Sequence, residues 1–253
     1  ATLEELQTIL DLARKHGLKV MLGSWIDSDR ERNDREVEAT IRLANTNRNV
    51  TRILVGNEVV LRGDLPVEDL IAHLDRVRAA TKQPVSTAEP WHVWIKHPEL
   101  VAHVDFIAVH MLPYWEGVEV EAAVGYVVAK LGEVRNAFPD KPIVIGEVGW
   151  PSEGRTRESA VATTANEALF LRRFLAYAEQ QRLEYFVMEA FDQPWKAAAE
   201  GKVGAYWGVY DADRQQKFEF RAPIVRVPLP RLFSATVVPD ADNIAPGLRV
   251  IGR

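Results

Sequence analysis

The 253-residue sequence contains no cysteine, which excludes disulfides, thiolate catalysis and cysteine-ligated metal sites. No apolar run approaches the ~20 residues that a membrane span needs, and no signal peptide opens the sequence. The turns after the expected strands carry no glycine-rich phosphate loop, which disfavours a dinucleotide-binding sheet. These absences leave a globular protein without a membrane span as the expectation.

Basic residues are outnumbered and form no run. Lys and Arg total 31 against 36 Asp and Glu, which gives a formal net charge of −5. We therefore expect no nucleic-acid partner. The apolar share of 47% is ordinary for a protein with a sizeable core. The length suits one barrel-sized domain.

Helical and strand-like patterns alternate over the first 220 residues. Apolar residues at helical spacing predict helices at 3–13, 37–44, 67–77, 120–134 and 171–178. Apolar β-type runs predict strands at 18–26, 51–56, 84–89, 104–110, 143–147 and 183–191. The repeated order of helix then strand predicts a parallel sheet with right-handed crossovers. Between these elements we expect a charged turn at 27–35 and an aromatic loop at 90–94.

From Arg221 the pattern changes to short apolar runs punctuated by prolines. Because proline confines strands to the edges of a sheet, an extended tail is favoured over extra strands in this segment. The sequence therefore predicts a barrel domain over 1–220 and a C-terminal tail over 221–253.

Two of the expected strands end in a carboxylate. Glu58 follows the strand at 51–56, and Glu147 closes the run that begins at Ile143. In α/β barrels the chemistry takes place at the carboxyl ends of the strands, although a last residue that only reaches solvent explains Glu147 equally well. A retaining glycosidase uses two carboxyls ~5–5.5 Å apart, one as nucleophile and one as acid/base. Two acids also suit a divalent metal, but no metal-binding motif accompanies them.

Aromatic side chains gather where the expected strands end. They are Trp25, Trp91, Trp94, Tyr114, Trp115, Trp150, Trp195 and Trp207. Aromatic faces beside polar groups suit the flat apolar faces of sugars. Packing in the core or at its rim is the competing explanation for each of them.

The sequence resembles glycoside hydrolase family 17 in three motifs that occur in the family's order. They are Val-Gly-Asn-Glu-Val at 55–59, His-Met-Leu-Pro-Tyr-Trp at 110–115 and Gly-Glu-Val-Gly-Trp-Pro at 146–151. Segments 191–196 and 204–211 strengthen the match. The resemblance covers roughly residues 3–220, and it looks most like the bacterial branch associated with cyclic and membrane β-glucan synthesis.

The resemblance implies an α/β fold of the (β/α)8 TIM-barrel type. It implies a retaining β-glycosidase or transglycosylase that acts on β-1,3-glucan through a covalent glycosyl-enzyme intermediate. In that match Glu147 is the nucleophile and Glu58 is the acid/base, which must be protonated when the substrate binds. No cofactor or metal is implied. The expected partner is a β-glucan oligo- or polysaccharide. The residues themselves leave the location open, and the resemblance favours an extracytoplasmic location, either periplasmic or secreted.

The resemblance also indicates which side chains contact the sugar. Asn57 would hold its 2-hydroxyl group, and Tyr114 would hydrogen-bond Glu147 and keep it ionised. The other expected substrate-binding residues are Trp91, Trp115, Trp150, Glu189, Lys196 and Trp207. For Glu189, a structural ion pair with Lys196 or a nearby arginine is as strongly expected as sugar binding.

The family's first two strands, with the helix between them, have no counterpart in this sequence, so only strands 3 to 8 are matched. The open sheet edges that result have three competing explanations. The tail after Arg221 fills the gap, another copy of the chain covers it in a homo-oligomer, or the sequence is a piece of a larger polypeptide. Because the missing strands would line part of the cleft, a non-catalytic β-glucan-binding pseudoenzyme is the alternative function.

Overall fold

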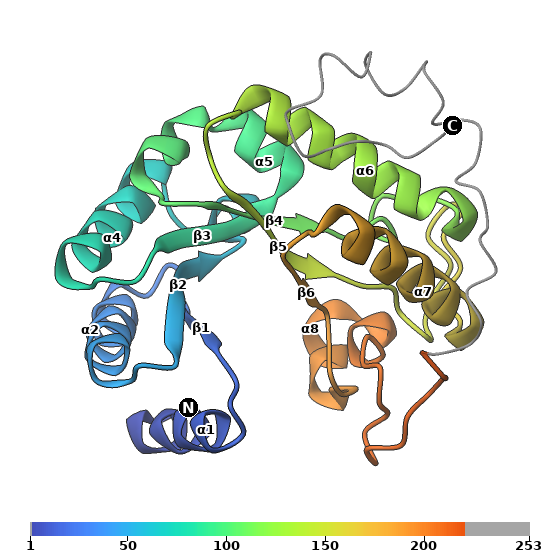
Figure 1. Cartoon of the computed structure of the whole chain (residues 1–253), viewed down its shortest axis with the longest axis horizontal. Helices are drawn as coiled ribbons and strands as arrows, with labels where there is room; N and C mark the ends of the chain where they lie inside the picture. The colour runs from blue at the N-terminus through green and yellow to red at the C-terminus, as the bar shows by residue number, and fades with distance from the viewer. Residues whose placement is uncertain (1, 221–253) are drawn as a thin grey trace. The chain divides into compact units, whose positions relative to one another are not determined.

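The computed structural model describes residues 2–220, in which helices alternate with strands (Figure 1). The expected tail at 221–253, with the alternative of extra strands in it, lies outside the described residues. The chain divides into two compact units. The first comprises the residues up to 109 together with 140–143, and the second comprises 110–139 and the residues from 144 onward.

The first unit is built around three parallel strands. Its elements are α1 (Leu3–Lys15), β1 (Val20–Ser24), α2 (Arg30–Thr46), β2 (Val50–Asn57), α3 (Val59–Arg62), α4 (Val67–Ala80), β3 (Val85–Pro90), α5 (Trp91–Lys96) and the 3₁₀ helix η1 (Pro98–His103). β1 pairs with β2 and β2 with β3, both in parallel. Helix α2 packs on β1 and β2, and α4 packs on β2 and β3. Leu70, Leu74 and Val77 form the buried stripe of α4, and Ile53 of β2 and Val85 of β3 are buried as well.

The second unit carries a further parallel pair of strands. Strand β4 (Ile107–Met111) and strand β5 (Ile143–Val148) enter it from the first unit, and the rest are α6 (Val120–Ala137), α7 (Thr164–Gln181), β6 (Tyr185–Val187), η2 (Pro194–Lys196), α8 (Ala197–Glu200) and η3 (Lys202–Ala205). β5 pairs with β6 in parallel, and α6 packs against α7. The strand order in the sheet is β1-β2-β3-β4-β5-β6, the same as in the chain. This is the α/β arrangement that the sequence predicts.

The charged turn expected at 27–35 is wrong, because α2 begins within it at Arg30. Asp29 caps the helix by accepting a hydrogen bond from the Arg32 backbone N–H at 3.0 Å. Asn33 is buried and exchanges two hydrogen bonds with the Asp27 backbone. The first apolar residue at helical spacing is Val37, so the polar first turns of α2 are invisible to a search for apolar periodicity.

The aromatic loop expected at 90–94 is also wrong. Pro90 ends β3 and α5 begins directly at Trp91, as a proline at the N-cap allows. Trp94 is fully buried, and its indole N–H donates to the Ala108 carbonyl at 3.0 Å. Core packing therefore explains Trp94.

Strand β6 is shorter than the expected strand at 183–191. The chain after Val187 exchanges hydrogen bonds with a later segment instead of continuing beside β5. Glu189 N donates to Trp207 O and Val209 N donates to Glu189 O, both at 3.0 Å. The apolar pattern predicted extended backbone correctly at 188–191, but it could not predict which segment pairs with it.

A buried ionic cluster ties the end of the described chain to α7. Lys217 Nζ lies 2.6 Å from Asp192 Oδ1, 2.7 Å from Ser152 Oγ and 3.8 Å from Glu167 Oε2. Glu167 is fully buried, and neither of its carboxyl oxygens accepts a hydrogen bond from the described residues. Burial raises the pKa of Glu167 from 4.5 to about 8, with Lys217 opposing the shift and Asp192 adding to it. Burial prevails over the ion pair because Lys217 donates to two nearer oxygens.

We predict that Glu167→Gln changes how stability depends on pH. The folded carboxyl holds its proton more tightly than the unfolded one, so wild-type stability falls as the pH rises from about 4.5 to about 8. The slope is at most ~1.4 kcal/mol per pH unit. The variant lacks this titration. In a thermal-denaturation series, its melting temperature relative to that of the wild type should therefore rise between pH ~5 and ~8. Glu153→Gln, which removes a half-exposed carboxylate of the same unit, serves as the control. If the melting temperatures of Glu167→Gln and wild type change with pH in the same way across this range, the raised pKa of Glu167 is contradicted.

Candidate active site

Glu58 lies at the carboxyl end of β2, in a sharp turn with unusual backbone geometry. Gly56 has φ 84°, and Glu58 has φ 55° and ψ 33°, in the left-handed region. A Cβ on residue 56 would lie 2.5 Å from Val59 Cγ2, so the turn requires glycine there. The Glu58 N–H donates to Ala88 O of β3 at 2.7 Å. The partly exposed Glu58 side chain is thus carried by a turn that is fixed against the neighbouring strand.

The same end of the first unit holds a cationic and aromatic contact. Arg62 donates to the carbonyls of Asn57 and Ile26 and forms an ion pair with Asp64. Its guanidinium lies 4.6 Å from the ring centroid of Trp25. Asn57, the last residue of β2, is partly exposed beside Glu58.

Trp91 is partly exposed at the start of α5, its ring set edge-on to His92 at 5.6 Å between centroids. In the first unit the structure therefore keeps Asn57, Glu58 and Trp91 accessible, as a site requires.

Glu147 is the last but one residue of β5 in the second unit, and its side chain is 29% exposed. His110 of β4 is buried, and its Nδ1 lies 3.7 Å from Glu147 Oε2. That distance is beyond a hydrogen bond but within ion-pair range if the imidazole is protonated. His110 is therefore a neighbour of the predicted nucleophile. It opens one of the three motifs, but no role was predicted for it from the sequence.

Tyr114, Trp150 and Trp207 form a buried aromatic cluster. Tyr114 packs edge-on against both tryptophans, with centroids 5.8 Å apart in each case. None of the three exposes any surface. Core packing explains the places of these three residues, and their expected contact with the sugar stays a prediction.

Tyr114 also has a different hydrogen-bond partner from the one expected. Its hydroxyl donates to the Arg155 carbonyl, and its single proton is not shared with Glu147. Burial raises the pKa of Tyr114. The Trp150 indole N–H donates to Val161 O at 3.0 Å. These residues hold the loop after β5 in place, which is a supporting role.

Trp115 lies at the rim of this cluster. It packs against Tyr114 and Trp207 at centroid distances of 5.2 and 5.8 Å and keeps part of its surface exposed. Arg157 donates to the Trp115 carbonyl, and its guanidinium lies 5.7 Å from the ring centroid. Trp115 is thus the member of the cluster that can offer a face to a ligand.

Glu189 and Lys196 form the ion pair that the sequence offered as the structural explanation. Lys196 Nζ lies 2.7 Å from Glu189 Oε2, which also accepts a hydrogen bond from the Gln193 amide. Trp195 beside them is 70% exposed, and its indole N–H donates to Gln193 Oε1 at 2.9 Å. The structural pairing of Glu189 is confirmed, and its contact with sugar stays a prediction.

The sequence reasoning also passed over Glu89, the last acid of β3. Glu89 is fully buried and accepts hydrogen bonds from the backbone N–H groups of Val60 and Leu61, at 2.8 and 3.2 Å. The available signal was its position, because Glu89 is a third carboxylate that closes an expected strand.

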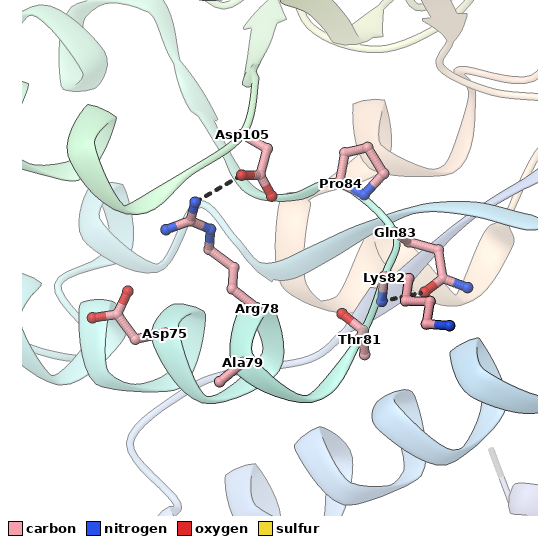
Figure 2. A pocket seen from close by; sticks show the side chains of 8 residues that line it. All are labelled: Asp75, Arg78, Ala79, Thr81, Lys82, Gln83, Pro84 and Asp105. Carbon is pink, nitrogen blue, oxygen red and sulfur yellow. Dashed lines mark hydrogen bonds and ion pairs between the residues drawn. The ribbon is translucent and has the colours of Figure 1, made fainter.

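One cavity of the first unit lies away from all of these residues. It has a volume of about 530 Å³ and is open to solvent between the end of α4 and the start of β3 (Figure 2). Arg78 spans part of it with an ion pair to Asp105 at 2.8 Å. The cavity sits at the amino end of β3, whereas Glu58 lies at the carboxyl end of β2. In barrels the amino-end face contributes to stability and not to chemistry.

Residues 2–220 contain neither a cluster of metal-ligating side chains nor a membrane-spanning helix. Within that range no three His, Asp or Glu side chains gather closely enough to hold a metal ion. No helix there is both long and apolar enough to cross a membrane.

Comparison with known proteins identifies relatives that match most of the chain. A family model described as BtgE/BtgC glycoside hydrolase domain matches residues 1–208. A glucan 1,3-beta-glucosidase of Arthroderma benhamiae is 29% identical over 228 residues, which cover 83% of this chain and 74% of that protein. A probable glucan endo-1,3-beta-glucosidase btgC of Aspergillus oryzae is 27% identical over 245 residues. This chain spans only 35% of the btgC protein's length.

Solved structures show the same relationship. The crystal structure of a glycoside hydrolase family 17 beta-1,3-glucanosyltransferase from Rhizomucor miehei is similar with a TM-score of 0.77 and 31% identity. The match covers 87% of this chain and 82% of that one. An active-site mutant of the Rhizomucor enzyme in complex with laminaritriose matches with a TM-score of 0.77 and 30% identity, over 86% and 82% of the two chains. These similarities confirm the expected α/β fold of the barrel type.

Proposed function

The chain belongs to the BtgE/BtgC glycoside hydrolase domain family, and from this membership we propose that it acts on β-1,3-glucan as a retaining glycosidase or glucanosyltransferase. The family 17 resemblance seen in the motifs is thereby confirmed. Its bacterial branch stays a prediction, because the relatives named above are fungal. The observation that carries the proposal is that Glu58 and Glu147, the two acids of the family's motifs, lie at the carboxyl ends of β2 and β5.

The proposed reaction has two steps with inversion at the anomeric carbon in each. In the first, the Glu147 carboxylate attacks the anomeric carbon while the Glu58 carboxyl donates its proton to the leaving oxygen. In the second, the Glu58 carboxylate takes a proton from water or from a sugar hydroxyl, and that oxygen displaces Glu147. Water gives hydrolysis and a sugar hydroxyl gives transglycosylation, so the same two carboxylates support both outcomes.

The other accessible residues are proposed to bind the substrate. Trp91 and Trp115 are proposed to stack on sugar faces, since both keep exposed aromatic surface. Asn57 is proposed to hold the 2-hydroxyl group beside the reacting carbon. The Glu189–Lys196 pair is proposed to bind sugar hydroxyls near the end of β6. Tyr114, Trp150 and Trp207, which are buried, are proposed to support Trp115 from the core.

We predict that the wild type converts laminarihexaose and that Glu147→Ala does so at least ~10³-fold more slowly, because removing a nucleophile removes the covalent route. Products are read by mass spectrometry, and folding is checked by thermal melting. Glu153→Ala in the loop after β5 removes a half-exposed carboxylate of the same unit and should leave the rate unchanged.

The product masses separate the remaining alternatives. Shorter sugars alone indicate hydrolysis, and longer sugars indicate transfer. A wild type that binds laminarihexaose without converting it would contradict the proposal and favour the β-glucan-binding pseudoenzyme. Full activity in Glu147→Ala would show that another group is the nucleophile.

A homo-oligomer is proposed to cover apolar surface on the first unit. Ile9 and Leu12 of α1 are 57% and 51% exposed, and Leu18 after the helix is 59% exposed. Apolar side chains gathered in this way favour contact with another protein surface.

We predict a mass of at least twice 28.5 kDa by light scattering. Ile9→Glu combined with Leu12→Glu should return the protein to the single-chain mass, because two charges would be buried in the contact. Arg14→Glu on the same helix makes the same change of two charge units without altering the apolar residues, and should not dissociate the assembly. A monomeric wild type would contradict the homo-oligomer.

A further inference from the structure

The backbone after Glu58 is held by one buried carboxylate. Glu89 lies near the end of β3 with no exposed surface. Its Oε1 accepts a hydrogen bond from Val60 N at 2.8 Å, and its Oε2 accepts one from Leu61 N at 3.2 Å. The two donors are the second and third residues after Glu58, so each oxygen of Glu89 engages one N–H of the turn that carries the proposed acid/base.

This turn needs such support because its geometry is unfavourable on its own. Glu58 is one of the few residues other than glycine with a left-handed backbone, at φ 55°. That conformation persists only where surrounding contacts determine it. Ala88, the residue directly before Glu89, accepts a hydrogen bond from the Glu58 N–H through its carbonyl oxygen at 2.7 Å. Consecutive residues of β3 therefore bind the turn through three hydrogen bonds, two of them to the Glu89 side chain.

Burial makes the Glu89 contacts strong. Hydrogen bonds to a carboxylate are stronger than those between neutral groups, and a water-poor environment strengthens them further. Arg62 holds the other side of the turn through the Asn57 carbonyl, but it lies nearer to solvent. Replacing the carboxylate by an amide leaves one buried backbone N–H facing an NH₂ group, which cannot accept its hydrogen bond.

We propose that Glu89 is a positioning residue that sets the place of the Glu58 carboxyl for proton transfer to the leaving oxygen. The inference rests on the proposed function of Glu58. A general acid acts only within hydrogen-bond reach of the atom it protonates, and a displacement of ~1 Å costs on the order of 100-fold in rate. Glu89 itself touches the turn and not the substrate.

The experiment compares two substrates with different needs for an acid. Laminarihexaose has a sugar leaving group that requires a proton, whereas 2,4-dinitrophenyl β-laminaribioside has a leaving group that departs without one. In Glu89→Gln, kcat/KM on laminarihexaose should fall ~10–100-fold, and kcat/KM on the aryl glycoside should change by less than ~3-fold. The ratio of the two values does not depend on the fraction of folded protein, so partial misfolding cannot produce the pattern.

Two further variants serve as controls for the result with Glu89→Gln. Glu167→Gln also replaces a fully buried glutamate but makes no contact with the Glu58 turn, so its ratio should equal that of the wild type. Glu58→Ala should show the same selective loss as Glu89→Gln, to a greater extent.

If kcat/KM of Glu89→Gln falls equally on both substrates, or falls on neither, the positioning role is overturned. A selective loss in Glu58→Ala would still uphold the proposed function in that case. If Glu58→Ala keeps full activity on laminarihexaose, or the wild type converts neither substrate, the proposed function fails and this inference fails with it.

Discussion

The parallel pairing of β2 with β3 is the constraint on which the Glu58 site depends. Its register places Asn57 opposite Ala88, so Glu58 and Glu89 leave adjacent strands at the same edge of the sheet. The N–H of Glu58 is then fixed to Ala88, and Glu89 reaches the backbone of the next turn. The pairing of β5 with β6 has the same effect in the second unit. Val148 lies opposite Val187, so Glu147 and Glu189 both lie near the carboxyl ends of these two strands.

The polar groups at the strand ends are supported by aromatic packing. Tyr114, Trp150 and Trp207 are sealed in the core, and two of them use their polar atoms to hold backbone carbonyls of the loop after β5. Trp115 rests on this cluster and keeps an exposed face. A rigid apolar base beneath a few exposed aromatic and polar groups is the usual construction of a ligand site.

The sequence predicted the strand ends well, because continuous apolar runs followed by Asn57–Glu58 and by Glu147 are strong local signals. It failed where the structure depends on capping or on distant partners. The start of α2 is defined by Asp29, a polar cap that apolar periodicity does not register. The shortening of β6 depends on a segment some twenty residues later. The acceptor of the Tyr114 hydroxyl and the burial of Trp207 are likewise set by packing, since residue type alone does not distinguish a core aromatic from an exposed one.

Glu147 is the proposed nucleophile of a retaining reaction, and trapping its glycosyl ester tests this role most directly. A 2-deoxy-2-fluoro-β-laminaribiosyl fluoride should react once and accumulate as an intermediate, because the 2-fluoro group slows both steps and the fluoride leaving group speeds only the first. Mass spectrometry of the digested protein should then find the sugar on the peptide that contains Glu147. A label on any other residue, or products of inverted anomeric configuration, would contradict the account.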